Sequence, residues 1–325
     1  MKILFATYPM AFFIPGGGEV QLLRYYKYLK TKKYNVDLLN IWDPKINKYD
    51  LVHFFGCIAG STHFCNAVKN LNIPLIISSS LWLTKETLKL YPIEEIKYQL
   101  NLADKIITNS KAESKAISEL LGIHKEKFTH IYNGVDLIFY KKNKNNSFKT
   151  KFKIKAPYVL NVANIETRKN QINLAIALKK FPEFKLIIIG NIRDKNYAEE
   201  LFKVAKEQLI FIGPLRSNSA LLRDAYLGAE IFCLPSTLET PGLSALEAFA
   251  TESKIILTKE GSTKEYFTDN VMYVDPLNIY SIEEKLDLMI NKNYNVNYKH
   301  KYNFEWGKTL ENLPDIYKKT IRNNG

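Results

Sequence analysis

The sequence predicts an α/β protein built from two doubly wound domains, each with a parallel sheet between layers of helices. Three observations lead to this prediction. The chain has 325 residues, of which 46% are hydrophobic, and this is typical of about two folded domains. Short apolar runs alternate with helical patterns, which favours parallel sheets covered by helices. The alternation occurs twice, on either side of a polar, basic and Asn-rich stretch at residues 140–157.

Six apolar runs in the first part of the chain are typical of buried strands. They lie at residues 2–7, 35–41, 51–56, 74–79, 105–110 and 128–133. A helix is expected over 19–33. Its predicted buried face consists of Val20, Leu23, Tyr26 and Leu29 (or Tyr28). Another helix over 111–122 should end at Gly122, a typical C-cap. Residues 1–150 are therefore assigned to an N-terminal domain.

The second part of the chain repeats the scheme. Its expected strands lie at residues 158–164, 185–191, 208–213, 231–236, 254–259 and 272–276. Residues 151–304 are therefore assigned to a C-terminal domain, and 140–157 to a linker with the entry to its first strand. A closing helical pattern over about 305–325 is interrupted at Pro314, because proline does not fit a helix interior.

The net charge of +13 is unevenly distributed. Residues 1–150 carry 21 Lys and Arg against 12 Asp and Glu, and the remainder carries 25 against 21. The excess in the first half indicates an anionic partner, which could be a membrane leaflet, a nucleic acid or a phosphorylated substrate. A general bias toward Lys and Asn explains it equally well. Basic and aromatic residues do not alternate as in a nucleic-acid groove, so no nucleic-acid partner is expected.

Segments that would direct the chain out of the cytoplasm are not expected. No apolar run approaches the ~18 residues that span a bilayer, and the N-terminus is interpreted as a first buried strand. Cys57, Cys65 and Cys233 have no metal-binding spacing. We therefore expect reduced thiols, no metal site and a cytoplasmic protein.

In doubly wound sheets, ligands bind beyond the carboxyl ends of the strands, so residues just after each strand are the candidates. Gly17 and Gly18 lie between the first strand and its helix. Glycines permit close backbone approach, and a helix N-terminus favours a phosphate or a sugar hydroxyl. The pattern is not G-x-G-x-x-G, so dinucleotide binding is not predicted, and a flexible loop remains an alternative.

Arg168 and Lys169 stand between a strand end and a helix in the second half. Two adjacent cations there would bind a diphosphate, the arginine as a fork and the lysine as a point charge. They could also stabilise charge on a departing phosphate. A solvated pair is the alternative, although cations near a helix start are mildly unfavourable.

Two carboxylates flank a Pro-Gly pair in ETPGLSALEAFA, residues 239–250. Glu239 follows a strand, Pro241 and Gly242 are expected to start a helix, and Glu247 lies just over one turn inside it. Amides around Gly242 and Leu243 would hold a phosphate, Glu247 a ribose and Glu239 a sugar. A glycosidase pair fits poorly, because its carboxylates must face one bond. A surface glutamate with a first-turn glutamate is the simplest alternative.

Four segments in this order resemble the family 4 glycosyltransferases, which have the GT-B fold. They are residues 109–136, which contain Asn-Gly-Val-Asp, the Arg-Lys stretch 164–178, the two-glutamate motif 239–248 and the closing helix 304–319. The resemblance covers nearly the whole chain. It implies two Rossmann-like domains facing across a cleft, with the closing helix crossing back onto the first, acceptor-binding domain.

The resemblance also implies an activity. Family members transfer a hexose-type sugar from a nucleoside diphosphate donor with retention of configuration and without a metal or another cofactor. The implied acceptor is a glycan or a lipid-linked molecule, as in polysaccharide or glycolipid synthesis. Arg168 and Lys169 would bind the diphosphate, Glu239 the donor sugar and Glu247 the ribose. Gly17 and Gly18 would lie near the donor phosphate or the acceptor.

The sequence departs from the family at two points. Ser78–Ser80 stand where many members have a histidine after the fourth strand, and Pro241 replaces the usual aromatic residue. The first departure leaves sugar recognition open. His53 lies within an expected strand and is interpreted as a core histidine, whereas His63 could be structural or functional.

These observations favour a retaining glycosyltransferase of the cytoplasm, peripheral on the inner face of the membrane, where its basic domain would meet anionic lipid. Three alternatives remain open. A sugar-nucleotide epimerase would share the architecture. A non-catalytic nucleotide-sugar-binding protein would fit the missing histidine. A nucleic-acid binder would use the positive charge.

Overall fold

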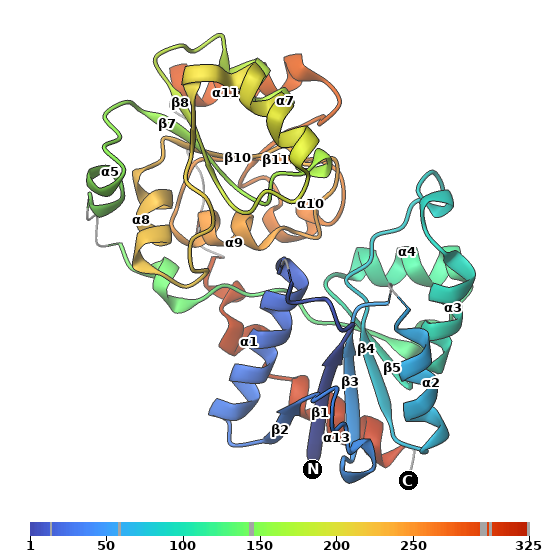
Figure 1. The fold of residues 1–325 in the computed structure, drawn as a ribbon. Coiled ribbons are helices and arrows are strands. Elements are labelled where there is room, and N and C mark those ends of the chain that lie inside the picture. Colours follow the sequence, from blue (N-terminus) through green and yellow to red (C-terminus); the bar gives the residue numbers. More distant parts are fainter. Residues whose placement is uncertain (14, 58–59, 143–145, 293–297, 299–300, 324–325) are drawn as a thin grey trace. The chain divides into compact units, whose positions relative to one another are not determined.

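The computed structural model describes residues 1–325 except 14, 58–59, 143–145, 293–297, 299–300 and 324–325. The chain divides into two compact units (Figure 1). Unit 1 comprises Met1–Asn133 and Trp306–Gly325, and unit 2 comprises Gly134–Glu305. The division therefore falls after Asn133, whereas the sequence placed it at residue 150. Residues 134–150 join unit 2 because Phe148 is buried there, in a helix that packs against another helix of that unit.

Unit 1 contains a parallel six-stranded sheet in the order β2-β1-β3-β4-β5-β6. Its strands are β1 (Lys2–Thr7), β2 (Asn35–Leu38), β3 (Leu51–Phe55), β4 (Leu75–Ser78), β5 (Lys105–Thr108) and β6 (Phe128–His130). Its helices are α1 (Gly17–Thr31), α2 (Thr62–Asn70), α3 (Ile93–Leu102), α4 (Lys111–Leu121), α12 (Trp306–Thr309) and α13 (Leu313–Arg322). The six predicted strands of the first half are confirmed.

The sheet of unit 1 is covered on both faces, which explains why its strands read as nearly continuous apolar runs. Side chains of α2, α3 and α4 pack with Leu4, Val52 and Ile77 on one face. Tyr317 of α13 packs against His53 on the other face, together with α1. In Figure 1, α1 and the α2–α4 group accordingly lie on opposite sides of the sheet.

His53 is a core residue of unit 1, as predicted. It is completely buried, with Nδ1 2.6 Å from the Tyr317 hydroxyl and Nε2 2.9 Å from Ser78 Oγ. Burial lowers the pKa of His53 to about 3, so its ring is neutral near pH 7. His63, on α2, is exposed.

The predicted buried face of α1 is wrong in all but Leu29. The buried residues are Gln21, Leu22, Tyr25 and Leu29, whereas Leu23 is 38% exposed. The helix is turned so that Gln21 and Leu22 point inward and Leu23 points outward.

Gln21 accounts for this rotation, because it finds polar partners at the edge of the sheet. Its Nε2 donates to Asn109 Oδ1 at 2.7 Å and to Asn133 Oδ1 at 2.9 Å, and its Oε1 accepts from Ser80 Oγ at 3.1 Å. Hydrogen bonds of this kind make burial of an amide side chain tolerable.

Unit 2 contains a second parallel six-stranded sheet, in the order β12-β11-β10-β7-β8-β9. Its strands are β7 (Tyr158–Val162), β8 (Lys185–Ile189), β9 (Leu209–Phe211), β10 (Ile231–Leu234), β11 (Ile255–Thr258) and β12 (Met272–Val274). Its helices are α5 (Ser147–Lys151), α6 (Gln171–Leu178), α7 (Lys195–Ala205), α8 (Ala220–Gly228), α9 (Leu243–Ala250), α10 (Thr263–Phe267) and α11 (Ile279–Asn291). All six strands predicted for the second half are present.

Helices also cover both faces of the second sheet. Leu174 of α6, Leu201 of α7 and Leu286 of α11 share one core with the strands. On the other face Tyr226 of α8 packs against Phe232 of β10.

Two predictions on the connecting and closing segments can be compared with the structure. The predicted linker at 140–157 contains helix α5. The predicted interruption at Pro314 is confirmed, since α13 begins at Leu313 with the proline in its first turn.

Candidate active site

The candidate site lies where four loops leave the carboxyl ends of neighbouring strands in unit 2. These loops follow β7, β8, β10 and β11, which are adjacent in the sheet. Backbone pairing continues beyond the strands, because Ile165 bridges to Ile192 and Glu239 bridges to Gly261. The sheet therefore brings together side chains that are far apart in the sequence, at the edge where doubly wound folds bind ligands.

Arg168, Lys169 and Glu239 meet at this edge. Lys169 Nζ lies 2.5 Å from Glu239 Oε1, and Arg168 Nη1 lies 3.8 Å from the same oxygen. The same Arg168 nitrogen donates to the Leu238 carbonyl at 3.0 Å. Both cations belong to a 3-10 turn, Thr167–Lys169, that precedes α6.

The turn that carries the cations is anchored by Asn170. This residue has φ of +57°, which asparagine tolerates better than most side chains. Its Nδ2 donates to the Pro235 carbonyl at 3.0 Å and to the Pro276 carbonyl at 2.7 Å. The loop after β7 is thereby tied to the loops after β10 and β12, which fixes the place of both cations.

Glu239 is an ionised carboxylate in a buried position, with 4% of the residue exposed. Burial on its own would raise the pKa of Glu239, but Lys169 and Arg168 outweigh burial and hold it below its ordinary value. A carboxylate of this kind carries its charge at neutral pH. It is suited to orient a polar ligand and not to donate a proton as a general acid.

The lowered pKa predicts how the ion pair contributes to stability. Since the folded-state pKa of Glu239 lies below 4.5, its contribution should be complete above that pH and be lost as the pH falls through the folded value. Urea unfolding of the native protein and of Glu239→Gln, from about pH 3 to about pH 7, should give a constant difference that shrinks only below pH 4.5. A difference that already disappears near neutral pH would contradict the ion pair.

Helix α9 begins at Leu243, two residues after Pro241, where the sequence placed its start. Gly242 is the N-cap with φ of +87°, and Pro241 precedes the cap instead of occupying the first helical position. Glycine adopts this conformation without the penalty of a side chain. Amides of the first turn, including those of Gly242 and Leu243, have no partner within the helix and suit an anion.

Glu247 is half-buried on α9 and faces α8. Its Oε2 accepts a hydrogen bond from the hydroxyl of Tyr226 at 2.7 Å. Burial, and then the charge of Glu247, raise the pKa of Tyr226 well above its ordinary value, so the tyrosine remains a donor. Tyr226 thus holds Glu247 in place, whereas Glu239 is held by Lys169 and Arg168. The assignment of Glu247 to a ribose stays a prediction.

Gly17 and Gly18 belong to unit 1, where they are exposed as the first two residues of α1. Gly16 is the N-cap, and its amide donates to Glu19 Oε2 at 2.6 Å. Glu19 thus caps the helix. The assignment of these glycines to a phosphate or an acceptor stays a prediction.

The serines that replace the family histidine are hydrogen-bonded. Ser78 contacts the ring of His53, and Ser79 Oγ donates to Glu113 Oε1 at 2.7 Å. Ser80 has φ of +44° and bonds to Gln21. These serines therefore form hydrogen bonds with buried polar side chains at the edge of the first sheet.

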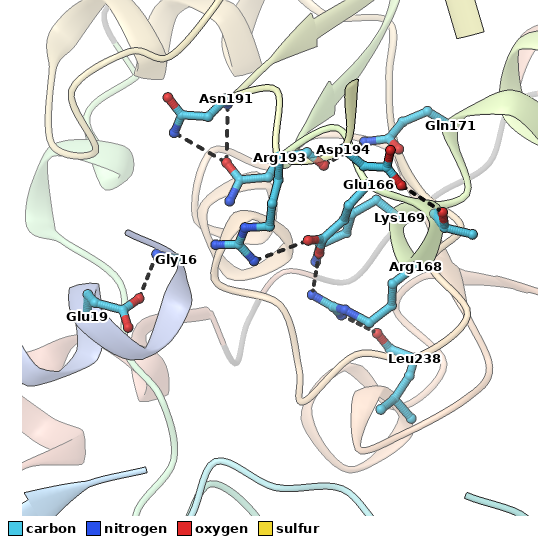
Figure 2. A network of polar contacts seen from close by, with 12 residues as sticks. Gly16, Glu19, Glu166, Arg168, Lys169, Gln171, Asn191, Arg193, Asp194 and Leu238 are labelled. Carbon is cyan, nitrogen blue, oxygen red and sulfur yellow. Dashed lines mark hydrogen bonds and ion pairs between the residues drawn. The ribbon is translucent and has the colours of Figure 1, made fainter. Parts of the chain in front are cut away.

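Two site residues were missed in the sequence. Glu166 accepts from Arg168 Nη2 at 3.0 Å and from Arg193 Nη1 at 3.1 Å (Figure 2). Only the positions of Glu166 and Arg193 could have indicated them, since Glu166 stands two residues before Arg168 and Arg193 lies in the loop after β8. The strand order that places these loops together cannot be read from the chain.

Two further findings concern the described part of the chain only. Within it, no three His, Cys, Asp or Glu side chains are grouped so as to hold a metal ion. Among the same residues, no helix combines the length and apolarity that crossing a membrane requires.

Comparison with known proteins agrees with this geometry. Residues 142–306 match the model of the glycosyl transferases group 1, and residues 18–139 match that of glycosyltransferase family 4. An uncharacterized glycosyltransferase of Methanocaldococcus jannaschii is 25% identical over 301 residues, which cover 84% of this chain and 76% of that protein.

Solved structures are similar over the whole chain. Sucrose-phosphate synthase from Thermosynechococcus elongatus has a TM-score of 0.83 at 14% identity, covering 99% of this chain and 100% of that one. Anabaena HepE in complex with UDP has a TM-score of 0.79 at 17% identity, covering 98% and 100%. These likenesses show that the fold is GT-B, as the sequence predicted.

Proposed function

The chain belongs to the glycosyl transferases group 1, and from this we propose that it transfers a hexose from a nucleoside diphosphate donor with retention of configuration. The acceptor is a glycan or a lipid-linked molecule, and the pathway is cell-surface polysaccharide or glycolipid synthesis. One observation carries the proposal. Arg168 and Lys169 stand at the ligand-binding edge of the sheet, next to the buried, ionised Glu239.

The proposed roles follow from charge and position. Arg168 and Lys169 bind the donor diphosphate, and the first-turn amides of α9 add hydrogen bonds to a phosphate. Glu239 accepts hydrogen bonds from the donor sugar, and Glu247 from the ribose. These groups are positioned before the donor binds, so they can stabilise the negative charge that grows on the leaving diphosphate.

The proposed reaction takes place on one face of the sugar. The acceptor hydroxyl attacks the anomeric carbon from the side on which the diphosphate departs. The bond between the anomeric carbon and the phosphate oxygen breaks, a new glycosidic bond forms, and a phosphate oxygen takes the hydroxyl proton. The cationic side chains take the place of a metal ion, so no cofactor is required. The low pKa of Glu239 supports this role, because an ionised carboxylate does not act as the acid of a glycosidase.

We propose a UDP-hexose as donor, and UDP-glucose is the first candidate. Structures similar to this chain are complexes of Anabaena HepE with UDP and with UDP-glucose. The experiment incubates the purified chain with UDP-glucose and a panel of sugar and lipid-linked acceptors, with and without EDTA. NMR of the anomeric proton should show an α-linked product in both cases. A β-linked product would overturn retention, and loss of activity in EDTA would overturn metal independence.

The same assay separates the alternative functions. An epimerase would convert the donor sugar without any acceptor. A non-catalytic binding protein would show a thermal shift with the donor and no turnover; at a ligand concentration ~100 times the dissociation constant, the stabilisation is about 2.7 kcal/mol. Neither a shift nor turnover with UDP-, GDP- and ADP-sugars would overturn the proposed donor class.

We propose further that the protein acts in the cytoplasm, attached to the inner face of the membrane through the basic first half. The support is charge, since residues 1–150 carry 21 basic against 12 acidic side chains. Flotation with anionic liposomes should recover the protein at low salt and lose it at high salt, because salt screens such attraction. Neutral liposomes are the control. Failure to bind anionic liposomes at low salt would contradict the attachment.

A further inference from the structure

Glu166 lies between two arginines in the rim of the site. Its Oε1 accepts from Arg168 Nη2 at 3.0 Å, and its Oε2 accepts from Arg193 Nη1 at 3.1 Å (Figure 2). The carboxylate is 14% exposed, whereas the side chains of Arg168 and Arg193 are 45% and 37% exposed. One shielded carboxylate thus holds two guanidinium groups that still reach solvent.

The backbone that carries these side chains is fixed by bonds between two loops. The amides of Arg193 and Asp194 both donate to the Ile165 carbonyl at 3.1 Å. Asn164 Oδ1 accepts from the amide of Asn191 at 3.2 Å. The loop after β8 is therefore joined to the loop after β7, and a site carried by such a rigid frame keeps its geometry.

The two arginines of this rim are its most exposed cations. Arg168, Lys169 and Arg193 are balanced by Glu166, Glu239 and Asp194, whose Oδ2 accepts from Thr167 Oγ1 at 3.4 Å, so the case for an anion rests on the exposed guanidinium groups and not on a net charge. Lys169 is close to Glu239, whereas the two arginines share Glu166. A guanidinium offers five N–H donors in a plane, and the side chains of Arg168 and Arg193 reach solvent beside their carboxylate, so both can turn N–H groups toward a phosphate.

We propose that Arg193 is a third cation for the donor diphosphate and that Glu166 is a positioning residue that orients Arg168 and Arg193 toward it. This inference rests on the proposed function, because it takes a nucleoside diphosphate as the ligand. Arg193 binds phosphate oxygens beside Arg168. Glu166 does not touch the donor.

The positioning role of Glu166 has an unusual consequence. Glu166→Gln removes a negative charge from the rim, so simple electrostatics predicts tighter binding of an anion. If the carboxylate orients both guanidinium groups, the same change should instead weaken binding, because the arginines lose their charge-assisted bonds and their fixed directions. The two effects have opposite signs.

The experiment measures binding of UDP and of uridine by calorimetry to the full chain and its variants. Arg193→Gln should weaken UDP binding about tenfold and leave uridine binding unchanged, since only UDP carries phosphates. Arg193→Lys should weaken it less, because it keeps the charge but not the fork. Glu166→Gln should weaken UDP binding several-fold. The double variant Glu166→Gln with Arg193→Gln should lose less UDP-binding free energy than the sum of the two single losses, because the two residues act together.

Lys180→Gln and Glu283→Gln are the matched controls. These residues form an exposed ion pair at 2.7 Å between the turn after α6 and helix α11, and their replacement should leave UDP binding unchanged. Unchanged UDP affinity in Arg193→Gln, or an equal loss for uridine, would overturn the role of Arg193. Tighter UDP binding by Glu166→Gln would overturn positioning. A native protein that binds no UDP, GDP or ADP would instead overturn the proposed function, and this inference with it.

Discussion

Replacing Glu239 by glutamine is expected to reduce kcat/KM for sugar transfer by about 10²–10³-fold. The change removes one charge and almost no volume. Glu239 is buried, its Oε1 receives Lys169 at 2.5 Å, and Arg168 lies 3.8 Å away. Without the carboxylate, the donor sugar loses its proposed hydrogen-bond acceptor and Lys169 loses its counter-charge, whereas Arg168 keeps Glu166. Steady-state kinetics with the donor identified by the thermal-shift screen would measure the loss.

Glu239→Gln should also destabilise the fold, because it leaves the Lys169 ammonium without its buried partner. Breaking such a pair from one side costs about 3 kcal/mol. The double variant Glu239→Gln with Lys169→Met should recover most of this loss, since neither buried charge then remains. Urea unfolding of the single and double variants measures both effects.

The outcome for the single variant decides between two roles of Glu239. A folded Glu239→Gln protein that transfers sugar at the native rate would show that the carboxylate only balances the charge of Lys169. Normal stability with lost transfer would instead contradict the buried ion pair. The matched control is Glu283→Gln, which removes a carboxylate from an exposed pair with Lys180 and should alter neither property.

The sequence alone was sufficient to predict the fold. Strands buried on both faces need apolar side chains in every direction, so runs such as 185–191 and 254–259 stand out from the helical pattern between them. Except for 2–7, which matches β1, the runs were predicted one to three residues too long, because the regular strand ends before the apolar pattern does. Backbone bonds still continue past some strand ends, as from the Ile131 amide to the Thr108 carbonyl at 2.9 Å after β6.

The sequence predicted those residues of the candidate site that stand as charged side chains in a loop after a predicted strand. Arg168 and Lys169 lie in the loop after β7 and Glu239 in the loop after β10, and the structure brings them together. Arg193 was missed because its link to Glu166 depends on β8 lying beside β7, and the sequence does not state that order.

Local chemistry misled the prediction in two other places. The helix after Glu239 begins at Leu243, because Gly242 adopts a positive φ that a sequence pattern does not reveal. The face of α1 was misassigned, because Gln21 is buried through partners on distant strand ends. In both cases a tertiary contact or a backbone angle outweighed the hydrophobic pattern.

Replacing Gly261 by alanine is expected to damage the site without changing any charge. Gly261 has φ of +97° and bridges to Glu239, and an added Cβ would lie 2.0 Å from the carbonyl oxygen of Glu239. No real Cβ atom lies so close to backbone, so the loop that carries the carboxylate must move. The strained φ alone costs about 1–3 kcal/mol, and displacement of the bridge adds to it.

The expected result for Gly261→Ala is therefore a joint loss. Its free energy of unfolding should fall by about 3 kcal/mol or more, and sugar transfer should fall by about 10²-fold, since a shift of about 1 Å in a catalytic group has such an effect. Gly18→Ala is the control for stability, because its Cβ would meet no atom within 4 Å. If Gly261→Ala is as stable and as active as the native protein, the backbone bridge does not set the position of Glu239. The proposed site would then need another means of holding its buried carboxylate against Lys169.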